Sequence, residues 1–397
     1  MTQPKARQPG MEPLSDIRVL DFSSMMAGPY CSRALADLGA HVIKVESLEG
    51  DHIRTQPPLR DGCSTYFGHL NSGKQSIALD LKQPESAALA RTLAKDVDIV
   101  LENFRPGVMA RLGLDYARLA AENTRLIYCS ISGYGQTGPD AERAAYAPII
   151  NAASGHDLAQ MQYQDAEGGP PNVGIFTADV LTGVYAVTAI QAALLQRART
   201  NRGQHLDVTL IESMMNLMVY EIQEAQFPAA ERRFVYTPVK ARDGFVMIVL
   251  VSPANFVNLC NAIGHPEWKD DPRFSTVMAR RENWDELMSL VGAWAQERSA
   301  KECEEFLNAA GVPCTQYRTV KEAMADPNLR ARGSLQQVSD AAGTFLVPNL
   351  PYRMDQDGAR ARAQVPALGQ HTDEILRDEL GLDDARIKKL RQARAVG

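Results

Sequence analysis

The stretch Ile17–Ser47, IRVLDFSSMMAGPYCSRALADLGAHVIKVES, decides the fold. An apolar strand-like run comes first, then a Gly-Pro turn, a segment rich in helix formers, and a second apolar run. This order predicts a strand, a helix and a strand, the unit that joins two parallel strands through a right-handed crossover. We therefore expect a parallel sheet to begin here.

The same alternation continues along the chain. The strand-like runs IALDL, DIVLEN and RLIYCSIS are separated by helical segments around ESAALARTLAK and YARLAAEN. Strands that alternate with helices are typical of an open α/β sheet covered on both faces. Further on, GQHLDVT predicts another strand, followed by a Met-rich helix in which Met214, Met215 and Met218 fill core or interface space.

The composition and the pattern of apolar residues change after Phe227. A polar segment is followed by a strand pair, VYTPVK and FVMIVLV, that flanks ARDG, and then by helical segments with Trp268, Trp284 and Trp294. These features indicate a smaller α+β domain. The tail, PALGQHTDEILRDELGLDDARIKKLRQ, predicts a helix, a Gly stop and a second, basic helix.

The bulk composition is that of an ordinary globular protein. The 397 residues are 45% hydrophobic and 23% charged, with a net charge of −6, so nothing favours nucleic acid or an anionic membrane as a partner. Residues 1–10 lack an apolar core typical of a signal peptide and are expected to be a short disordered lead. No run is expected to reach the roughly 18 apolar residues of a membrane span.

The cysteines lack the spacing of a metal site or a redox motif. This pattern favours reduced thiols, argues against structural zinc and predicts a cytoplasmic location. The six residues are Cys31, Cys63, Cys129, Cys260, Cys303 and Cys314.

Two motifs imitate nucleotide-binding sites. GHLNSGKQS (68–76) has the glycine and lysine spacing of a P-loop, but Gln75 stands where a Ser or Thr must bind magnesium, and a strand follows instead of a helix. The first strand–helix turn has only Gly28 of the three glycines of a dinucleotide site. No glycine motif therefore supports a role for Glu46 as a ligand of the ribose. No GxSxG or HExxH motif indicates a hydrolase or a metalloenzyme.

Several segments together identify a family. VLDFSSMMAGPYCSRALADLGAHVIKVES, SIALDLK, ENFRPGVMARLGL, RLIYCSISGYGQTGP and RGQHLDVTLIES resemble, in order, the motifs of the class III CoA-transferases. The resemblance spans nearly the whole chain. It implies a Rossmann-like large domain made from both chain ends (11–225 and 333–397), a small domain (226–332) and an interlocked homodimer.

The resemblance also implies where coenzyme A, as acyl-CoA substrate, would bind. Such a site needs cations for phosphates, a flat apolar face for adenine and free amides at a turn. By similarity the contacts are Met26, Ala27, Leu79, Lys82, Asn103, Phe104, Arg105, Arg111 and Tyr146. From the residues alone, Phe104 is equally consistent with core packing, Arg111 with a solvated helix position and Lys82 with a surface charge.

Asp179, in VGIFTADVLTG, has two interpretations. From the residues alone it is the N-cap of the helix that follows. The resemblance makes it the catalytic nucleophile, which forms a mixed anhydride and then an aspartyl-CoA thioester. A carboxylate is ionised at pH 7 without a base, and a helix amino-terminus should keep it so, which explains the missing histidine.

Departures from the family pattern narrow the reaction. Tyr146 and Ala147 stand where the racemase branch has histidine and aspartate, which favours a transferase over a racemase or epimerase. Ser47 and Gln75 replace arginines that are common in the family, and ERRFVYTPVK offers no clear glycine-rich lid. Two alternative functions stay open, namely another acyl-CoA enzyme of this fold and a CoA-binding protein without catalytic activity. The acids are not specified, although short dicarboxylates such as succinate fit by analogy.

Overall fold

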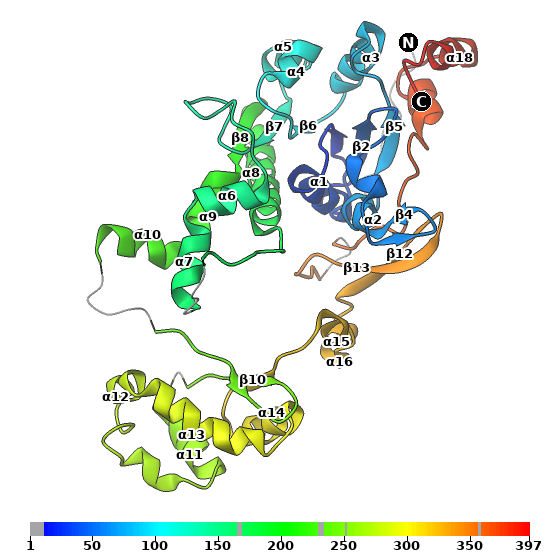
Figure 1. Ribbon diagram of the computed structural model, residues 1–397. Coiled ribbons are helices and arrows are strands. Elements are labelled where there is room, and N and C mark those ends of the chain that lie inside the picture. Colours follow the sequence, from blue (N-terminus) through cyan, green and yellow to red (C-terminus); the bar gives the residue numbers. More distant parts are fainter. Residues whose placement is uncertain (1–11, 165–168, 229–233, 251, 356–358) are drawn as a thin grey trace. The chain divides into compact units, whose positions relative to one another are not determined.

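The computed structural model describes residues 12–164, 169–228, 234–250, 252–355 and 359–397 (Figure 1). Two compact units divide the described residues. One runs through Gln226 and resumes at Ala331–Gly397, and the other lies within Phe227–Arg330. The expected disordered lead and the first part of ERRFVYTPVK fall outside the described residues.

The larger unit is built on a six-stranded sheet in which every neighbouring pair is parallel. Its strand order is β5-β2-β1-β6-β7-β8. The strands are β1 (Arg18–Asp21), β2 (His41–Glu46), β5 (Gln75–Ala78), β6 (Ile99–Glu102), β7 (Ile127–Ser132) and β8 (Gln204–Thr209). The prediction of a parallel α/β sheet is therefore confirmed. The chain builds outward from β1 in one direction and then from β6 in the other, so the order reverses between these two strands.

Helices cover both faces of this sheet, because alternate strand residues point to opposite sides. Ile99 and Leu101 pack on the face that carries α1 (Ala27–Asp37), α8 (Thr177–Thr200) and α9 (Leu210–Leu217). Val100 packs on the other face, under α3 (Pro84–Ala94), α4 (Val108–Leu112) and α5 (Tyr116–Glu122). The remaining helices before the second unit are α2 (Thr65–Asn71), η1 (His52–Thr55), α6 (Ala147–Ala153), α7 (His156–Tyr163) and α10 (Val219–Gln226).

The expected Met-rich helix is two helices, because α9 ends at Leu217 and Met218 leaves the helical backbone conformation before α10 begins. Met214 is fully buried on the α8 face of the sheet, whereas 39% of Met215 is exposed.

The chain end completes the larger unit. The hairpin β12 (Leu335–Asp340) and β13 (Gly343–Pro348), absent from the prediction, precedes the two expected helices, α17 (Thr372–Asp378) and α18 (Asp384–Gln392). The Thr372 hydroxyl accepts a hydrogen bond from the amide of Ala78 at 3.1 Å, and the amide of Gly397 donates to the Ala78 carbonyl at 3.0 Å. The return segment is thus tied to the end of β5. A two-stranded ribbon, β3 (Leu59–Arg60) and β4 (Cys63–Ser64), also belongs to this unit.

The smaller unit carries an antiparallel sheet of order β11-β10-β9. The strands are β9 (Val239–Lys240), β10 (Phe245–Ile248) and β11 (Cys314–Gln316), and only the first two were expected. Trp268 and Trp284 are buried in its core, and Trp294 packs against it. Its helices are α11 (Pro253–Ala262), η2 (Pro266–Lys269), α12 (Val277–Glu282), α13 (Trp284–Gln296), α14 (Ala300–Ala309) and α15 (Val320–Met324), with α16 (Pro327–Ala331) at the boundary.

Helix α8 differs from expectation in one respect. By length and composition it is apolar enough to cross a membrane, although no such run was anticipated. It lies along α1 and contacts the sheet through β7 and β8 (Figure 1). Small residues allow this close approach: a Cβ atom on Gly183 would lie only 2.9 Å from the carbonyl oxygen of Ala27 and from the ring of Tyr30.

The contact at Gly183 gives a stability prediction. Gly183→Ala should lower the free energy of unfolding by about 1–3 kcal/mol, because the added methyl must push α8 away from α1. Gly292→Ala is the matched control. It also lies inside a helix, but its added Cβ would meet no atom within 4 Å, so we expect a gain of up to about 1 kcal/mol. Urea denaturation of both variants tests this, and an unchanged midpoint for Gly183→Ala would contradict it.

Candidate active site

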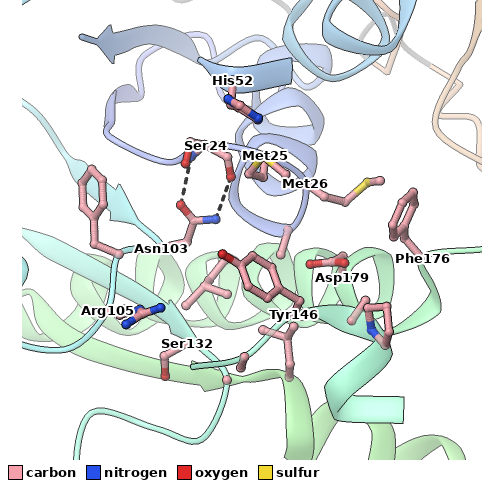
Figure 2. A pocket seen from close by; sticks show the side chains of 18 of the residues that line it. Ser24, Met25, Met26, His52, Asn103, Arg105, Ser132, Tyr146, Phe176 and Asp179 are labelled. Atoms are coloured by element: carbon pink, nitrogen blue, oxygen red, sulfur yellow. Dashed lines mark hydrogen bonds between the residues drawn. The ribbon is translucent and has the colours of Figure 1, made fainter. Parts of the chain in front are cut away.

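A pocket of about 550 Å³ opens at the carboxyl ends of β1, β6 and β7 (Figure 2). Crevices at this edge, where the strand order reverses, are the usual ligand sites of open α/β sheets. The loops after the three strands form its walls together with the starts of α1, α6 and α8. The titratable side chains that line it are His52, Tyr66, Arg105, Arg143, Tyr146 and Asp179.

Asp179 is the third residue of α8, and its carboxylate points into the pocket (Figure 2). The N-cap position belongs to Phe176, and no side chain of the described residues caps the helix, so the interpretation of Asp179 as the N-cap is wrong. Burial raises the pKa of this carboxyl group to about 6. A carboxyl group with a pKa of about 6 is mostly ionised at pH 7, even though burial opposes the effect expected of the helix terminus.

The turn after β1 forms the wall that faces Asp179. Met25 in this turn has a φ of 66°, a left-handed conformation that is uncommon for a residue other than glycine. Its neighbour Ser24 pairs with Asn103 through both backbone groups, as the dashed lines of Figure 2 show. The Asp51 carboxylate accepts a hydrogen bond from the Met25 amide at 3.3 Å. The turn is thus held from two sides.

Buried charges lie beneath this turn. Lys44 pairs with Asp51 at 2.9 Å and donates to the carbonyl of Ser23 at 2.7 Å. Lys74, part of the apparent P-loop motif, is fully buried, and its ammonium group contacts Asp21 at 3.2 Å. Burial lowers the pKa of Lys74 to about 8. This lysine therefore supports the turn from below through Asp21, and it does not line the pocket.

Most of the residues predicted for the site come together in this pocket, namely Met26, Ala27, Asn103, Phe104, Arg105, Tyr146 and Asp179. Phe104 both lines the pocket and packs against the core, so its two interpretations coexist. Leu79, Lys82 and Arg111 do not line it. Leu79 is 1% exposed within the core beside Val396, whereas Lys82 and Arg111 are exposed to solvent.

Three further residues considered as nucleotide contacts, Glu46, Ser47 and Gln75, also lie outside the pocket. Glu46 is buried and forms an ion pair with Arg54 at 2.7 Å, which occupies the carboxylate that a ribose would need. The Ser47 hydroxyl donates to the Gly50 carbonyl within its own turn. Gln75 opens β5 and contacts His41. None of the three lines the pocket.

Sequence reasoning missed several lining residues, among them His52, Gln56, Tyr66, Ser132 and Arg143. Ser132 could have been found, because it ends a predicted strand on the edge where ligands bind. Burial and the negative charge of Asp179 raise the pKa of Tyr66 to about 12, so this phenol keeps its proton. Within the described residues no cluster of His, Cys, Asp and Glu could hold a metal ion, and all six cysteines are free.

The fold and the pocket define an α/β protein that places one carboxylate in a ligand crevice. Residues 14–372 match the model of CoA-transferase family III, so the chain belongs to this family of enzymes.

Named relatives and a solved structure agree with this assignment. The chain is 34% identical to the succinate–glutarate CoA-transferase of Agrobacterium fabrum, over 95% of this chain and 97% of the relative. It is 36% identical to the succinyl-CoA–D-citramalate CoA-transferase of Chloroflexus aurantiacus, over 97% and 98%. The crystal structure of a CaiB/BaiF family protein from Brucella suis superposes with a TM-score of 0.82 at 34% identity, covering 93% and 99% of the two chains.

The pKa of Asp179 predicts how stability depends on pH. Between about pH 4 and pH 6 the folded protein binds the Asp179 proton more tightly than the unfolded chain does, so the carboxyl group costs stability as the pH rises. Asp179→Asn removes this cost. We expect the variant to melt at a higher temperature than the unmodified protein at pH 7.5, and the difference to shrink towards zero near pH 4. A variant that melts lower at pH 7.5 would contradict the raised pKa.

Proposed function

We propose that this protein transfers coenzyme A from an acyl-CoA thioester to a free carboxylic acid through an aspartyl-CoA intermediate on Asp179. The observation that carries the proposal is a half-buried carboxylate at a helix amino-terminus inside the pocket, ionised at pH 7 without a base. Carboxylates act as covalent nucleophiles in other enzymes. Family membership supports the same reaction.

The steps balance without any proton transfer. An oxygen of Asp179 attacks the thioester carbonyl, the carbon–sulfur bond breaks, and the CoA thiolate leaves a mixed anhydride behind. The thiolate then attacks the Asp179 carbonyl carbon and expels the donor acid as a carboxylate. The acceptor carboxylate attacks this aspartyl thioester and releases the thiolate, which finally attacks the acceptor's acyl carbon and frees Asp179. Water must stay out, because it would hydrolyse both intermediates.

The pocket walls supply complementary roles in this proposal. Phe104 offers a flat apolar face, Arg105 a cation for phosphate, and Tyr66 a phenol that keeps its proton and can donate a hydrogen bond to a reacting oxygen. Lys82 and Arg111, exposed outside the pocket, are proposed to reach the nucleotide end of CoA. Leu79 could contribute only through its backbone, since its side chain is buried.

The transferase reaction is favoured over racemisation by the residues at the start of α6. A racemase needs two proton-transfer groups that flank one carbon. Tyr146, with 62% of its surface exposed, and the buried Ala147 occupy the positions of the racemase histidine and aspartate. Tyrosine ordinarily titrates near pH 10, too high to exchange a proton readily at neutral pH.

A dicarboxylic acid is the proposed acceptor. The names of the relatives from Agrobacterium fabrum and Chloroflexus aurantiacus include succinate, glutarate and citramalate, all of which carry two carboxylates. The lining of the pocket includes Arg105 and Arg143. If Arg105 pairs with a CoA phosphate, Arg143 is left to bind the carboxylate that does not react. Among the described residues, the ion pair of Arg143 with Asp140 is long, at 3.6 Å, and exposed to solvent.

Acceptor kinetics test the role of Arg143. Arg143→Ala should raise KM for succinate roughly tenfold, as expected when a charged hydrogen-bonding partner is lost. It should leave KM for a monocarboxylate such as butyrate within a factor of two, and Arg143→Lys should recover part of the loss. An equal rise in KM for both acids would assign Arg143 to another role.

We also propose an interlocked homodimer located in the cytoplasm. Large apolar side chains on the outer faces of α8 to α10 are exposed in the single chain, which supports a subunit interface there. They are Val184, Tyr185, Leu195, Leu217 and Val219. Chains threaded through each other separate only by unfolding, so sedimentation velocity should give a dimer at every dilution. A monomer that appears on dilution would contradict the interlocking.

The central experiment traps the intermediate. Incubation with succinyl-CoA and no acceptor, followed by hydroxylamine, should modify the peptide containing IFTADVLTG at Asp179 alone. Asp179→Asn and Asp179→Ala should still fold and bind CoA but lose transfer by several orders of magnitude, because neither side chain forms an anhydride.

Asp157→Asn is the matched control for this experiment. Asp157 also lies in the first turn of a helix, α7, but outside the pocket, so its variant should keep both the label and the activity. An active Asp179→Asn variant, or transfer without any label on this peptide, would refute the proposal.

A further inference from the structure

We propose that Asn103 is a positioning residue whose side chain fixes the turn after β1 against Asp179, instead of a direct contact to coenzyme A. The inference rests on the proposed function, because it assigns the turn a role in the attack by Asp179. It revises the assignment of Asn103 that the family resemblance suggests.

The carboxamide of Asn103 is already occupied on both of its polar atoms. Its Oδ1 accepts a hydrogen bond from the Ser24 amide at 2.9 Å, and its Nδ2 donates to the Ser24 carbonyl at 2.8 Å (Figure 2). These two bonds join residues 79 positions apart in the sequence. A CoA contact could use only the second lone pair of Oδ1 or the second hydrogen of Nδ2, because Ser24 already engages one of each.

The two hydrogen bonds between Asn103 and Ser24 continue the pairing of β1 with β6 beyond the point where their backbone hydrogen bonds end. The last backbone bond between β1 and β6 runs from the amide of Phe22 to the carbonyl of Leu101 at 2.8 Å. Beyond this bond, the segments that follow β1 and β6 diverge to opposite faces of the sheet, because the strand order reverses here. Asn103 supplies the next donor and acceptor from its side chain, and so it holds the two diverging loops together across the mouth of the crevice.

The turn needs such support because its backbone is strained. Met25 adopts a positive φ, a conformation that is unfavourable in a residue other than glycine and persists only where the surroundings impose it. Asn103 holds the residue before Met25. The carboxylate of Asp51 holds the Met25 amide itself.

The turn matters because it sets the wall opposite the nucleophile. Met26 and Ala27 line the pocket directly after the strained residue and begin α1. Ala27 also packs on Gly183, one helical turn from Asp179. A displacement of the turn would therefore change the space between Asp179 and a bound thioester, which lowers the rate of attack more than the affinity for CoA.

The loop that carries Asn103 is itself fixed. The carboxylate of Glu102 accepts a hydrogen bond from the amide of Phe104 at 2.9 Å, so the backbone on either side of Asn103 has little freedom. Asn103 is thus a rigid support, as a positioning residue must be.

Three measurements on Asn103→Ala test the proposal. Hydrogen exchange of peptides that cover Ser24–Ala27 should accelerate at least tenfold, because the Ser24 amide loses its acceptor. Single-turnover formation of the Asp179 adduct should slow by roughly 10- to 100-fold, the effect of losing two hydrogen bonds. The Kd for CoA, measured by calorimetry, should stay within about threefold.

Asn349→Ala is the matched control. Its carboxamide clamps backbone in the same way, to Gly333 at 2.8 Å and from Ala361 at 2.9 Å, but it lies outside the pocket around Asp179. We expect unchanged adduct formation and unchanged exchange in the turn. Asn103→Asp is a second variant in case the alanine protein folds poorly. Its carboxylate keeps an acceptor for the Ser24 amide but places an oxygen against the Ser24 carbonyl where Asn103 has a donor, so exchange in the turn should still accelerate while the Kd for CoA should hold.

A direct CoA contact gives the opposite pattern. Asn103→Ala would weaken CoA binding by the same factor as it slows the adduct and would leave exchange in the turn unchanged, and Asn103→Asp would repel the phosphates and raise the Kd strongly. Either result overturns the proposal. Failure of the proposed function can be told apart from failure of this inference, because hydrogen exchange and CoA affinity can be measured without CoA transfer. If the unmodified protein forms no adduct, the proposed reaction is refuted. The role of the Asn103–Ser24 hydrogen bonds is then judged by hydrogen exchange alone.

Discussion

The reversal of strand order between β1 and β6 is the constraint on which the rest of the site depends. The chain that leaves β1 turns to one face of the sheet and the chain that leaves β6 turns to the other, so the two loops cannot close over the gap between them. A crevice at this point follows from topology, and the pocket occupies it. The side chain of Asn103 bridges the mouth of the crevice through its two hydrogen bonds to the backbone of Ser24.

Buried charges beneath the turn add specificity more than stability. Removing an ammonium or a carboxylate from water costs several kcal/mol, and pairing in the interior repays this only when the geometry is good. Lys44 and Lys74 meet Asp51 and Asp21 at hydrogen-bonding distance. Lys44 also donates to the Ser23 carbonyl in the turn, and Lys74 donates to the Pro29 carbonyl in the first turn of α1. Apolar residues of similar size could fill this volume, but they could not hold a strained turn by its backbone. The arrangement is therefore best understood as a support for the pocket.

The sequence predicted the sheet and part of the site, for a physical reason. Parallel strands are buried on both faces, so their apolar runs are easy to recognise, and the residues that follow their carboxyl ends must meet at one edge. Met26, Asn103 and Phe104, which the family resemblance suggested, follow such strand ends and line the pocket. Leu79 also follows a strand, but β5 is at the far edge of the sheet, where its side chain is buried beside Val396. Tyr66 lies in the short helix α2, which the sequence did not predict, and Arg143 lies in an irregular segment, so only the folded chain brings them into the pocket with Asp179.

The raised pKa of Asp179 suits a group that must both attack and leave. In the proposed cycle its carboxylate attacks a thioester and is later expelled from an anhydride, and the acids on the other side of each exchange have pKa values of about 4 to 5, like ordinary carboxyl groups. A carboxylate with a pKa near 6 is slightly more nucleophilic than these acids, yet it is still ionised at pH 7 and still departs readily. Much deeper burial would protonate it, and full exposure would admit water to the anhydride. In the proposed cycle, the half-buried position at the start of α8 avoids both protonation and hydrolysis, which would allow a single aspartate to serve without a base.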